Sequence, residues 1–228
     1  MSIQQMLFAV KVFLPVLTFE SAVEQEVGPS TNATIGAPTV TVSGDFRLLF
    51  AWQDTTQEST FTASSGWTKI GQQDLRPALG VWYSTTDNTN VTVTGATAGA
   101  SGDDWNLIRM RFSSNKPINT ITASVSDFER RVNSYSHQIT PPTDGANYTY
   151  LHVFGLSGRP RNNLSEPASI SRQPGNIDEP NKVINSDSDA VAYYEIYSPG
   201  ETTLGTYTYN NINDSGQMSS VGLWIGFT

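Results

Sequence analysis

The chain contains no cysteine, so neither disulfide bonds nor thiolate metal sites can take part in its folding or its chemistry. A chain without cysteine fits folding in a reducing cytoplasm. Histidine is scarce as well, with 2 residues in 228. Few side chains are therefore available as a general acid or base near neutral pH.

Basic residues are also few. The sequence holds 13 lysines and arginines against 21 acidic residues, and its formal net charge is −8. Neighbouring basic residues occur at Arg130 and Arg131 and, more loosely, at Arg159 and Arg161. The backbone of a nucleic acid would be repelled over most of such a surface. We therefore expect no nucleic-acid partner.

Long helical patterns are a further absence. After residue 30, no window of helical length carries apolar residues at three-to-four spacing without a helix breaker. The apolar fraction of 37% is still large enough to fill a core. Threonine, serine, asparagine and glycine fill the intervals between short apolar runs, as they do between strands. The sequence predicts an all-β protein, and at this length we expect one large domain.

Four strand-like segments occur twice and in the same order. In most of them apolar residues recur with a period of two, the spacing that buries one face of a strand. The equivalent segments are 46–52 and 150–156, 79–83 and 191–195, 91–93 and 207–209, and 108–112 and 223–227. Their order is kept while the connections change length. We predict a jelly-roll-like antiparallel β-sandwich built from two similar halves, residues 40–126 and 140–228, with an N-terminal arm.

Three other stretches complete the predicted organisation. Residues 118–125 alternate apolar and polar side chains and predict a strand between the halves. Pro141 and Pro142 mark the boundary of the second half. Residues 157–189, rich in proline and asparagine, predict a long loop, the favoured place for a functional loop or a partner contact.

Residues 1–39 are predicted to form a docking arm and a linker. Lys11 lies inside the apolar run rather than before it, unlike the charge of a signal peptide, and Pro15 interrupts a run already too short for a bilayer. A targeting segment is the alternative to an arm that docks on a neighbour. Residues 20–39, punctuated by glycine and proline, predict the linker. The expected docking residues are Met6, Leu7, Phe8, Val10, Val12, Phe13 and Leu14.

Catalytic patterns are missing. His152 stands in an alternating segment where the first half has Leu48, which predicts a hydrogen-bonded core histidine. His137 follows a polar run, and we expect it to be exposed. A glycosidase needs two carboxylates at a suitable separation. The candidates are Asp103 with Asp104, Asp127 with Glu129, Asp187 with Asp189, and Glu195.

Structural or solvated roles are favoured for these carboxylates, because the sequence brings no two of them into one cleft. The segment 186–189 could hold calcium, but it lacks the glycine and the distal glutamate of an EF-hand loop. We predict no catalytic residue, no cofactor and no metal site.

Aromatic residues support a binding hypothesis, since an exposed ring on a sandwich can stack on a sugar. Trp67 and Trp105 are expected in the core. Trp82 and Trp224 lie on the strand face opposite to their apolar neighbours, and this face meets solvent, a second layer or another subunit. The candidate glycan-contacting residues are Tyr194, Tyr197, Tyr207 and Tyr209.

The order of four motifs resembles the β-sandwich modules of bacteriophage tail-fibre and other virion proteins. The motifs are GDFRLLFAW at 44–52, GWTKI at 66–70, LGVWY at 79–83 and DWNLI at 104–108. In those modules a GDLLL strand is followed by a GWT segment, a VYYK strand and a strand led by tryptophan. The resemblance runs from about residue 40 to the end. The second half departs from it, with PASIS at 167–171 in place of GWT and no lysine after Tyr194.

The resemblance implies a non-enzymatic structural protein of a bacteriophage virion, either a head decoration or fibre or a tail-fibre subunit. Such a protein acts through assembly onto the particle. Its expected partners are other virion proteins and further copies of this chain, without membrane insertion, and its expected location is the virion, assembled in the bacterial cytoplasm. The alternative is a glycan-binding receptor-recognition module at a tail or fibre tip, and a polysaccharide-cleaving domain ranks last.

Overall fold

In the part of the chain that the structure describes, the regular secondary structure consists of β-strands. The computed structural model describes residues 17–37, 45–53, 60–73, 78–86, 89–95, 104–125, 135–142, 149–158, 169–173, 181–185, 190–197, 206–212 and 218–228. Within these residues the chain forms strands β1 to β16 and no helix. The predicted all-β class is confirmed.

The first eight strands form two antiparallel sheets. They are β1 (Leu17–Val27), β2 (Asn32–Ile35), β3 (Asp45–Gln53), β4 (Phe61–Ala63), β5 (Thr68–Gln73), β6 (Ala78–Ser84), β7 (Val91–Gly95) and β8 (Trp105–Ser114). The first inner sheet has the order β1-β8-β3-β6-β5, and the first outer sheet has the order β2-β7-β4.

The next eight strands form two further antiparallel sheets. They are β9 (Ile118–Val125), β10 (Tyr135–Ile139), β11 (Thr149–Gly158), β12 (Ser169–Gln173), β13 (Asn181–Asn185), β14 (Ala190–Tyr197), β15 (Thr206–Ile212) and β16 (Met218–Phe227). The second inner sheet has the order β13-β14-β11-β16-β9, and the second outer sheet has the order β10-β15-β12.

The two sets of strands have the same connectivity. Adding eight to each strand number of the first inner and outer sheets reproduces the strand orders of the second pair, with the second inner sheet read from β9. The four segment pairs found in the sequence are β3 with β11, β6 with β14, β7 with β15 and β8 with β16. The repeat is therefore real, and it includes four strand pairs that the sequence pattern did not reveal.

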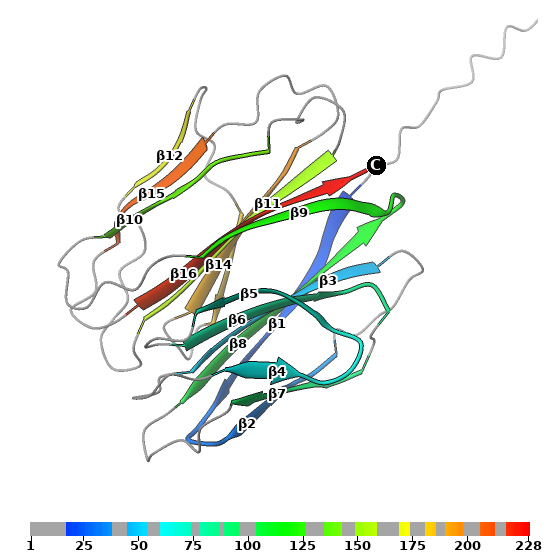
Figure 1. Ribbon diagram of the computed structural model, residues 1–228, viewed down its shortest axis with the longest axis vertical. Helices are drawn as coiled ribbons and strands as arrows, with labels where there is room; N and C mark the ends of the chain where they lie inside the picture. Colours follow the sequence, from blue (N-terminus) through cyan, green and yellow to red (C-terminus); the bar gives the residue numbers. More distant parts are fainter. Residues whose placement is uncertain are drawn as a thin grey trace, which may run out of the picture.

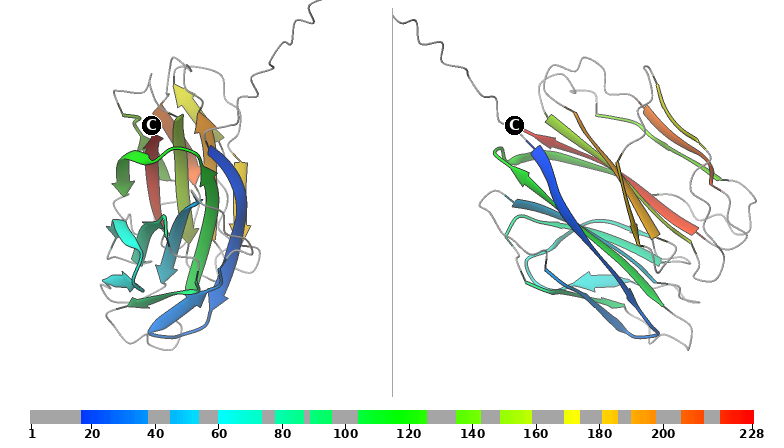
Figure 2. Two further views of the ribbon diagram at one scale, coloured as in Figure 1. Left: turned by 90° about the vertical axis from the view of Figure 1, so that its right-hand side faces the viewer. Right: turned by 180° about the vertical axis from the view of Figure 1, so that it is seen from behind.

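The four sheets stack as layers, in the order first outer, first inner, second inner and second outer (Figures 1 and 2). Three hydrophobic clusters fill the three spaces between them. Both inner sheets are thus covered on both faces, which is why eight successive residues of β8, from Trp105 to Phe112, are buried. Trp82 and Trp224 face the outer sheets, so the face opposite to their apolar neighbours meets a second layer.

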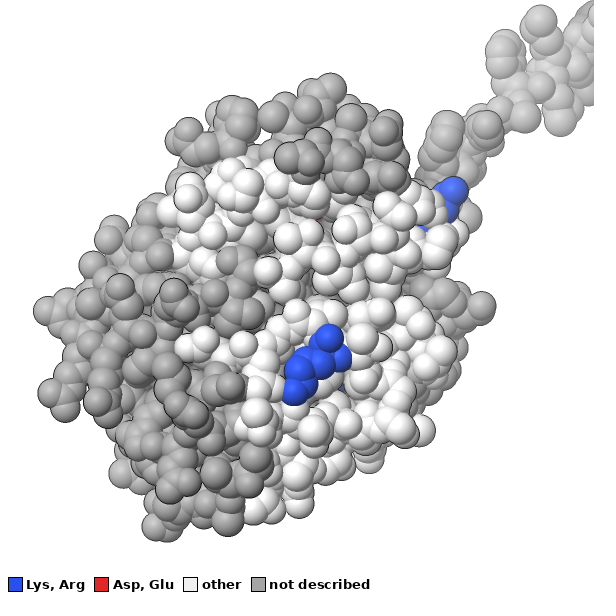
Figure 3. Space-filling model, in the orientation of Figure 1, with Lys and Arg blue, Asp and Glu red and all other residues white. Residues whose placement is uncertain are grey.

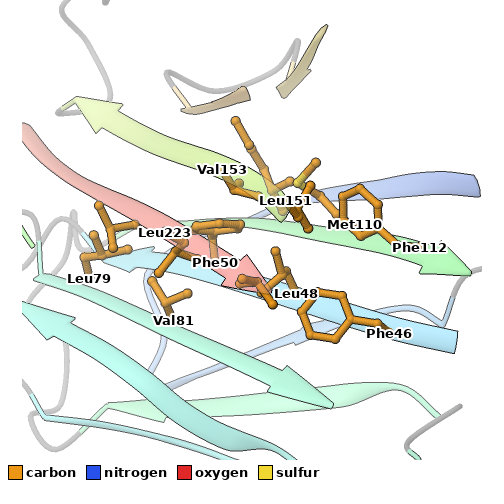
Figure 4. Packing of buried hydrophobic residues seen from close by; sticks show 14 of the residues in the cluster. Phe46, Leu48, Phe50, Leu79, Val81, Met110, Phe112, Leu151, Val153 and Leu223 are labelled. Carbon is orange, nitrogen blue, oxygen red and sulfur yellow. The ribbon is translucent and has the colours of Figure 1, made fainter. Parts of the chain in front are cut away.

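The central cluster joins the two halves. It takes alternate residues of β3, namely Phe46, Leu48, Phe50 and Trp52, and packs them against residues of β11 and β16 (Figure 4). Gly155 of β11 lets the sheets approach closely, because a Cβ there would lie 2.8 Å from Cδ1 of Phe50. Phe50 in turn stacks on Trp52, with ring centroids 5.7 Å apart.

The N-terminal half begins earlier than the sequence suggested. Residues 20–39 were predicted to be a linker, but β1 covers Leu17–Val27 and β2 covers Asn32–Ile35. β1 pairs along its length with β8, and Leu17 enters the central cluster. The polar side chains that favour a linker belong here to an edge strand, where one strand edge and much of one face meet water.

The boundary between the halves also differs from the predicted one. The strand at 118–125 is β9, the first strand of the second repeat, so the repeat unit changes between Ser114 and Ile118. The predicted loop at 157–189 contains β12 and β13. The GWT segment leads into β5, whose equivalent is β13, whereas PASIS ends in β12.

Candidate functional site

A pocket lies where the two halves are connected. Its volume is about 370 Å³. It is lined by the beginning of β3, the end of β6, the turn between β8 and β9, and the end of β16. The lining residues are Phe46, Tyr83, Thr85, Ser114, Lys116, Pro117, Ile118 and Phe227. The pocket therefore combines residues that are distant in sequence and that come from both repeats.

The walls of the pocket are held by ring packing and by a hydrogen-bonded turn. Phe46 meets Phe227 edge to face at 5.6 Å and Tyr83 at 6.1 Å, measured between ring centroids. Ser114 Oγ donates to the Lys116 carbonyl at 2.7 Å, and the amide of Thr228 donates to the Pro117 carbonyl at 3.2 Å. Thr228 thus helps to fix the turn that forms one side of the pocket.

The chemistry of this pocket suits an apolar group. Aromatic and aliphatic side chains make most of the wall, and Thr85 and Lys116 are exposed beside it. Its volume falls at the lower end of the range of about 300–1,000 Å³ that is usual for ligand sites. None of the described lining residues is acidic. The pocket can therefore take apolar side chains or a small apolar molecule.

A second notable cluster lies between the second inner sheet and the second outer sheet. Tyr197 donates a hydrogen bond to Glu195 Oε2 at 3.1 Å, and its hydroxyl also bonds that of Tyr207. His152 stacks on Tyr207, with ring centroids 4.1 Å apart, and its Nδ1 lies 3.2 Å from the Leu223 carbonyl. A carbonyl can only accept, so Nδ1 carries the proton. His152 is the buried, hydrogen-bonded core residue that its sequence position predicts.

This cluster alters the glycan hypothesis. Tyr197 and Tyr207 are each 1% exposed, so neither ring offers a face on which a sugar could stack. Tyr194 is partly buried against Phe19, with centroids 4.5 Å apart, and burial raises the pKa of its phenol. Tyr209 belongs to β15, and its side chain lies outside the described part. Of the four predicted tyrosines, Tyr194 alone has a described side chain that reaches solvent.

His137 is buried, contrary to the expectation of an exposed side chain. It is 5% exposed, and its Nδ1 lies 2.8 Å from Ser220 Oγ. Burial lowers the pKa of His137 from 6.5 to about 4, because the charged form loses its hydration. The prediction of an exposed His137 was wrong because it relied on the polar neighbours at 134–138. Side chains alternate between the two faces of a strand, so a buried histidine can stand next to an exposed glutamine such as Gln138.

Three arginines gather on the face of the first inner sheet that meets the first outer sheet. Arg47 and Arg111 are directly opposite each other in the β3–β8 pairing, and all of Arg47, Arg109 and Arg111 are buried. Arg109 Nη1 donates to the carbonyls of Gly36 at 3.1 Å and Thr89 at 2.7 Å. The sequence could have predicted this grouping, because along β3 and β8 each arginine alternates with residues of the central cluster and therefore lies on the opposite face of its strand.

The GWT motif belongs to the same region. Gly66 has a φ of 91°, a left-handed conformation that glycine adopts readily. The turn places Trp67 over the guanidinium of Arg109, with the ring centroid 5.2 Å from Cζ. A cation over an indole face is stabilised by the ring's electron density. Trp67 is thus a half-buried cover for a buried arginine rather than a fully buried core residue.

Charged residues are sparse on the described surface seen in Figure 3. Two separate basic areas appear there, and no acidic residue shows among the described atoms of that face. Exposed carboxylates are present on β1, at Glu20, Glu24 and Glu26. β1 is the edge of its sheet, and charge on an edge strand disfavours pairing with another strand.

Several predicted features lie outside the described residues. They are the arm residues Met6, Leu7, Phe8, Val10, Val12, Phe13 and Leu14, and the possible calcium segment 186–189. In the described part, no three or more histidine or acidic side chains gather as they would around a metal ion. That part also holds no helix with the length and hydrophobicity needed to cross a membrane.

No protein-family model matches the chain, and no curated protein matches its sequence.

Proposed function

We propose that this chain is a non-enzymatic structural protein of a bacteriophage virion, a head decoration or fibre or a tail-fibre subunit. It acts through assembly onto the particle, with other virion proteins and further copies of itself as partners. The motifs at 44–52, 66–70, 79–83 and 104–108 and their resemblance to virion modules support this proposal.

The observation that carries the proposal is the duplicated strand order. With the strands of each half numbered 1 to 8, the inner sheet has the order 1-8-3-6-5 and the outer sheet has the order 2-7-4. This arrangement supports a jelly-roll-like fold, an architecture used by viral capsid and lectin domains. Two such units packed through their inner sheets make one thick block. A block of this kind supplies shape and rigidity, which is what a particle component needs.

The burial of the inner sheets also limits where partners can bind. Both faces of each inner sheet are covered, so contacts with a particle must use the outer faces, the strand edges, the loops or the N-terminal segment. The apolar residues between Met6 and Leu14 are the best candidates, because a contiguous apolar run in the sequence is typical of a segment that packs on a partner.

Immunogold electron microscopy tests the proposal directly. An antibody against this chain should label virus particles purified from lysates of the bacterium that carries the gene, over the head or at the tail. Particles without label, in a lysate that contains the protein, would refute the virion role.

The docking segment can be tested separately by co-sedimentation with particles that lack the protein. Deletion of residues 1–16 should abolish co-sedimentation, whereas deletion of residues 1–5 should preserve it because the apolar run remains. A longer deletion, through residue 30, would remove β1 and its contribution to the core, so it would not separate docking from folding. Equal binding by both deletion variants would show that docking uses another surface.

The alternative, a glycan-binding module at a tail or fibre tip, is supported by the stacked pair Phe19 and Tyr194 between β1 and β14. Tyr194→Ala should then reduce binding to host-surface glycans at least tenfold, while Tyr207→Phe should leave it unchanged because that ring is buried. Unchanged glycan binding by Tyr194→Ala would show that the pair of Phe19 and Tyr194 is not a glycan-binding site.

A further inference from the structure

The start of β1 and the pocket between the halves lie at the same end of the molecule. Leu17, the first residue of β1, pairs with Ser114, and Ser114 lines the pocket. We propose that the side chains of Phe13 and Leu14 of the same chain occupy this pocket in the unassembled protein. The contact concerns the isolated chain, so it does not rest on the virion proposal.

The distances allow this contact. Leu14 and Phe13 precede Leu17 by three and four positions, and these steps span about 10–13 Å when the chain is extended. In the inner sheet the order β1-β8-β3 places Phe46, a wall of the pocket, two strand spacings from β1. Two spacings amount to about 10 Å. Residues 13 and 14 can therefore reach the pocket without displacing any described strand.

The chemistry of the two partners also agrees. The half-buried ring of Tyr83 and the largely buried rings of Phe46 and Phe227 line the pocket, and rings pack well against aromatic and aliphatic side chains. Phe13 and Leu14 are adjacent large apolar residues that would otherwise add to an exposed apolar run.

The tether favours the segment of the same chain over that of a second copy. A short link holds the segment near the pocket at an effective concentration of the order of mM, well above the concentration of other copies in dilute solution. Occupation of the pocket and docking on a particle are then alternative uses of one segment. Assembly would withdraw Phe13 and Leu14 from the pocket.

The absence of cysteine makes disulfide trapping a clean test. F13C/T85C and L14C/T85C place one thiol on the segment and one on the exposed rim of the pocket. The control pair, F13C/T62C, uses an exposed threonine of β4. Phe61, beside it, packs on Trp105 at the opposite end of β8, about 30 Å from Ser114.

We expect at least one Thr85 pair to lose its free thiols at least tenfold faster than the control under mild oxidation. The product should migrate as a monomer on a non-reducing gel, and its rate should not depend on protein concentration. Equal rates for Thr85 and Thr62 pairs would refute a specific contact. Disulfide-linked dimers formed at a concentration-dependent rate would assign the segment to a second copy and overturn the proposal.

A dye measurement gives an independent readout on unmodified side chains. The anionic apolar dye anilinonaphthalene sulfonate should bind the chain lacking residues 1–16 more strongly than the full chain, because the deletion opens the pocket beside Lys116. Lys116→Glu in the shortened chain provides a check that the dye reports this pocket, because it reverses the charge beside the anionic dye at an exposed position and leaves the core intact. Stronger dye binding by the full chain would mean that the segment is exposed and the pocket is not covered.

Discussion

Replacement of Gly155 by alanine should destabilise the protein by forcing apart the two inner sheets. A Cβ at this position of β11 would lie 2.8 and 2.9 Å from two carbons of Phe50 and 3.2 Å from Trp52. These rings belong to the central cluster, where Phe50 and Trp52 are fully buried and stacked on each other. The new methyl group therefore meets a wall that has no solvent side into which to move.

The size of the effect follows from this geometry. Ordinary van der Waals contact begins near 3.4 Å, so the Phe50 ring must shift by roughly 0.6 Å in a close-packed interior. Overpacking of this kind typically costs about 1–3 kcal/mol. For a chain of this size that corresponds to a midpoint of thermal unfolding lower by about 2–12 °C.

Guanidinium unfolding followed by tryptophan fluorescence measures the change. Gly28→Ala is the matched control, because nothing lies within 4 Å of a Cβ there, and its effect should stay within about 0.5 kcal/mol. Phe50→Leu should partly relieve the clash, so the double variant should be more stable than the sum of the single effects by about 1 kcal/mol. Equal stability of Gly155→Ala and Gly28→Ala would refute the close approach of the two halves.

Two further predictions concern buried polar groups. Because the folded-state pKa of His137 is lowered to about 4, the unfolded chain takes up the proton first as pH falls below 6.5. Stability present at neutral pH is therefore lost toward pH 4. Between pH 7 and pH 5 the wild type should lose about 2 kcal/mol more unfolding free energy than His137→Asn, and equal losses would contradict a buried neutral histidine. Arg109→Met should cost roughly 2–3 kcal/mol, since the carbonyls of Gly36 and Thr89 lose a charged donor. Lys116→Met, at an exposed position, should change stability by less than about 0.5 kcal/mol, and similar losses in both variants would contradict the structural role of Arg109.

The four strand pairs that the sequence revealed are those with the most regular apolar alternation. β3 and β8 carry Phe, Leu, Trp, Ile and Met at every second position, because one of their faces fills the central cluster. β1, β2, β4 and β5 lie at sheet edges or in the thin outer sheets, and fewer of their side chains are buried. A segment such as LTFESAVEQEV therefore looks like a linker until its pairing with β8 is known.

The candidate site residues also divide into those that could be predicted from the sequence and those that could not. The core role of His152 could be predicted, since its position in an apolar strand is a local property. The burial of His137 depends on packing between β10 and the second inner sheet. β10 has too few apolar residues for this burial to be predicted from the sequence. Tyr197 and Tyr207 looked available for sugars, yet their hydroxyls bond each other across two sheets.

The sequence by itself determined the all-β class, the presence of a repeat and the order of its strongest strands, because alternation and turn residues act over a few neighbouring positions. The tertiary structure alone decided that each repeat holds eight strands among the described residues and that the inner sheets are covered on both faces. It also decided that the turn between the repeats forms a pocket with Phe46, Tyr83 and Phe227. These features arise from contacts between residues far apart in the chain. Their partners cannot be read from any single segment.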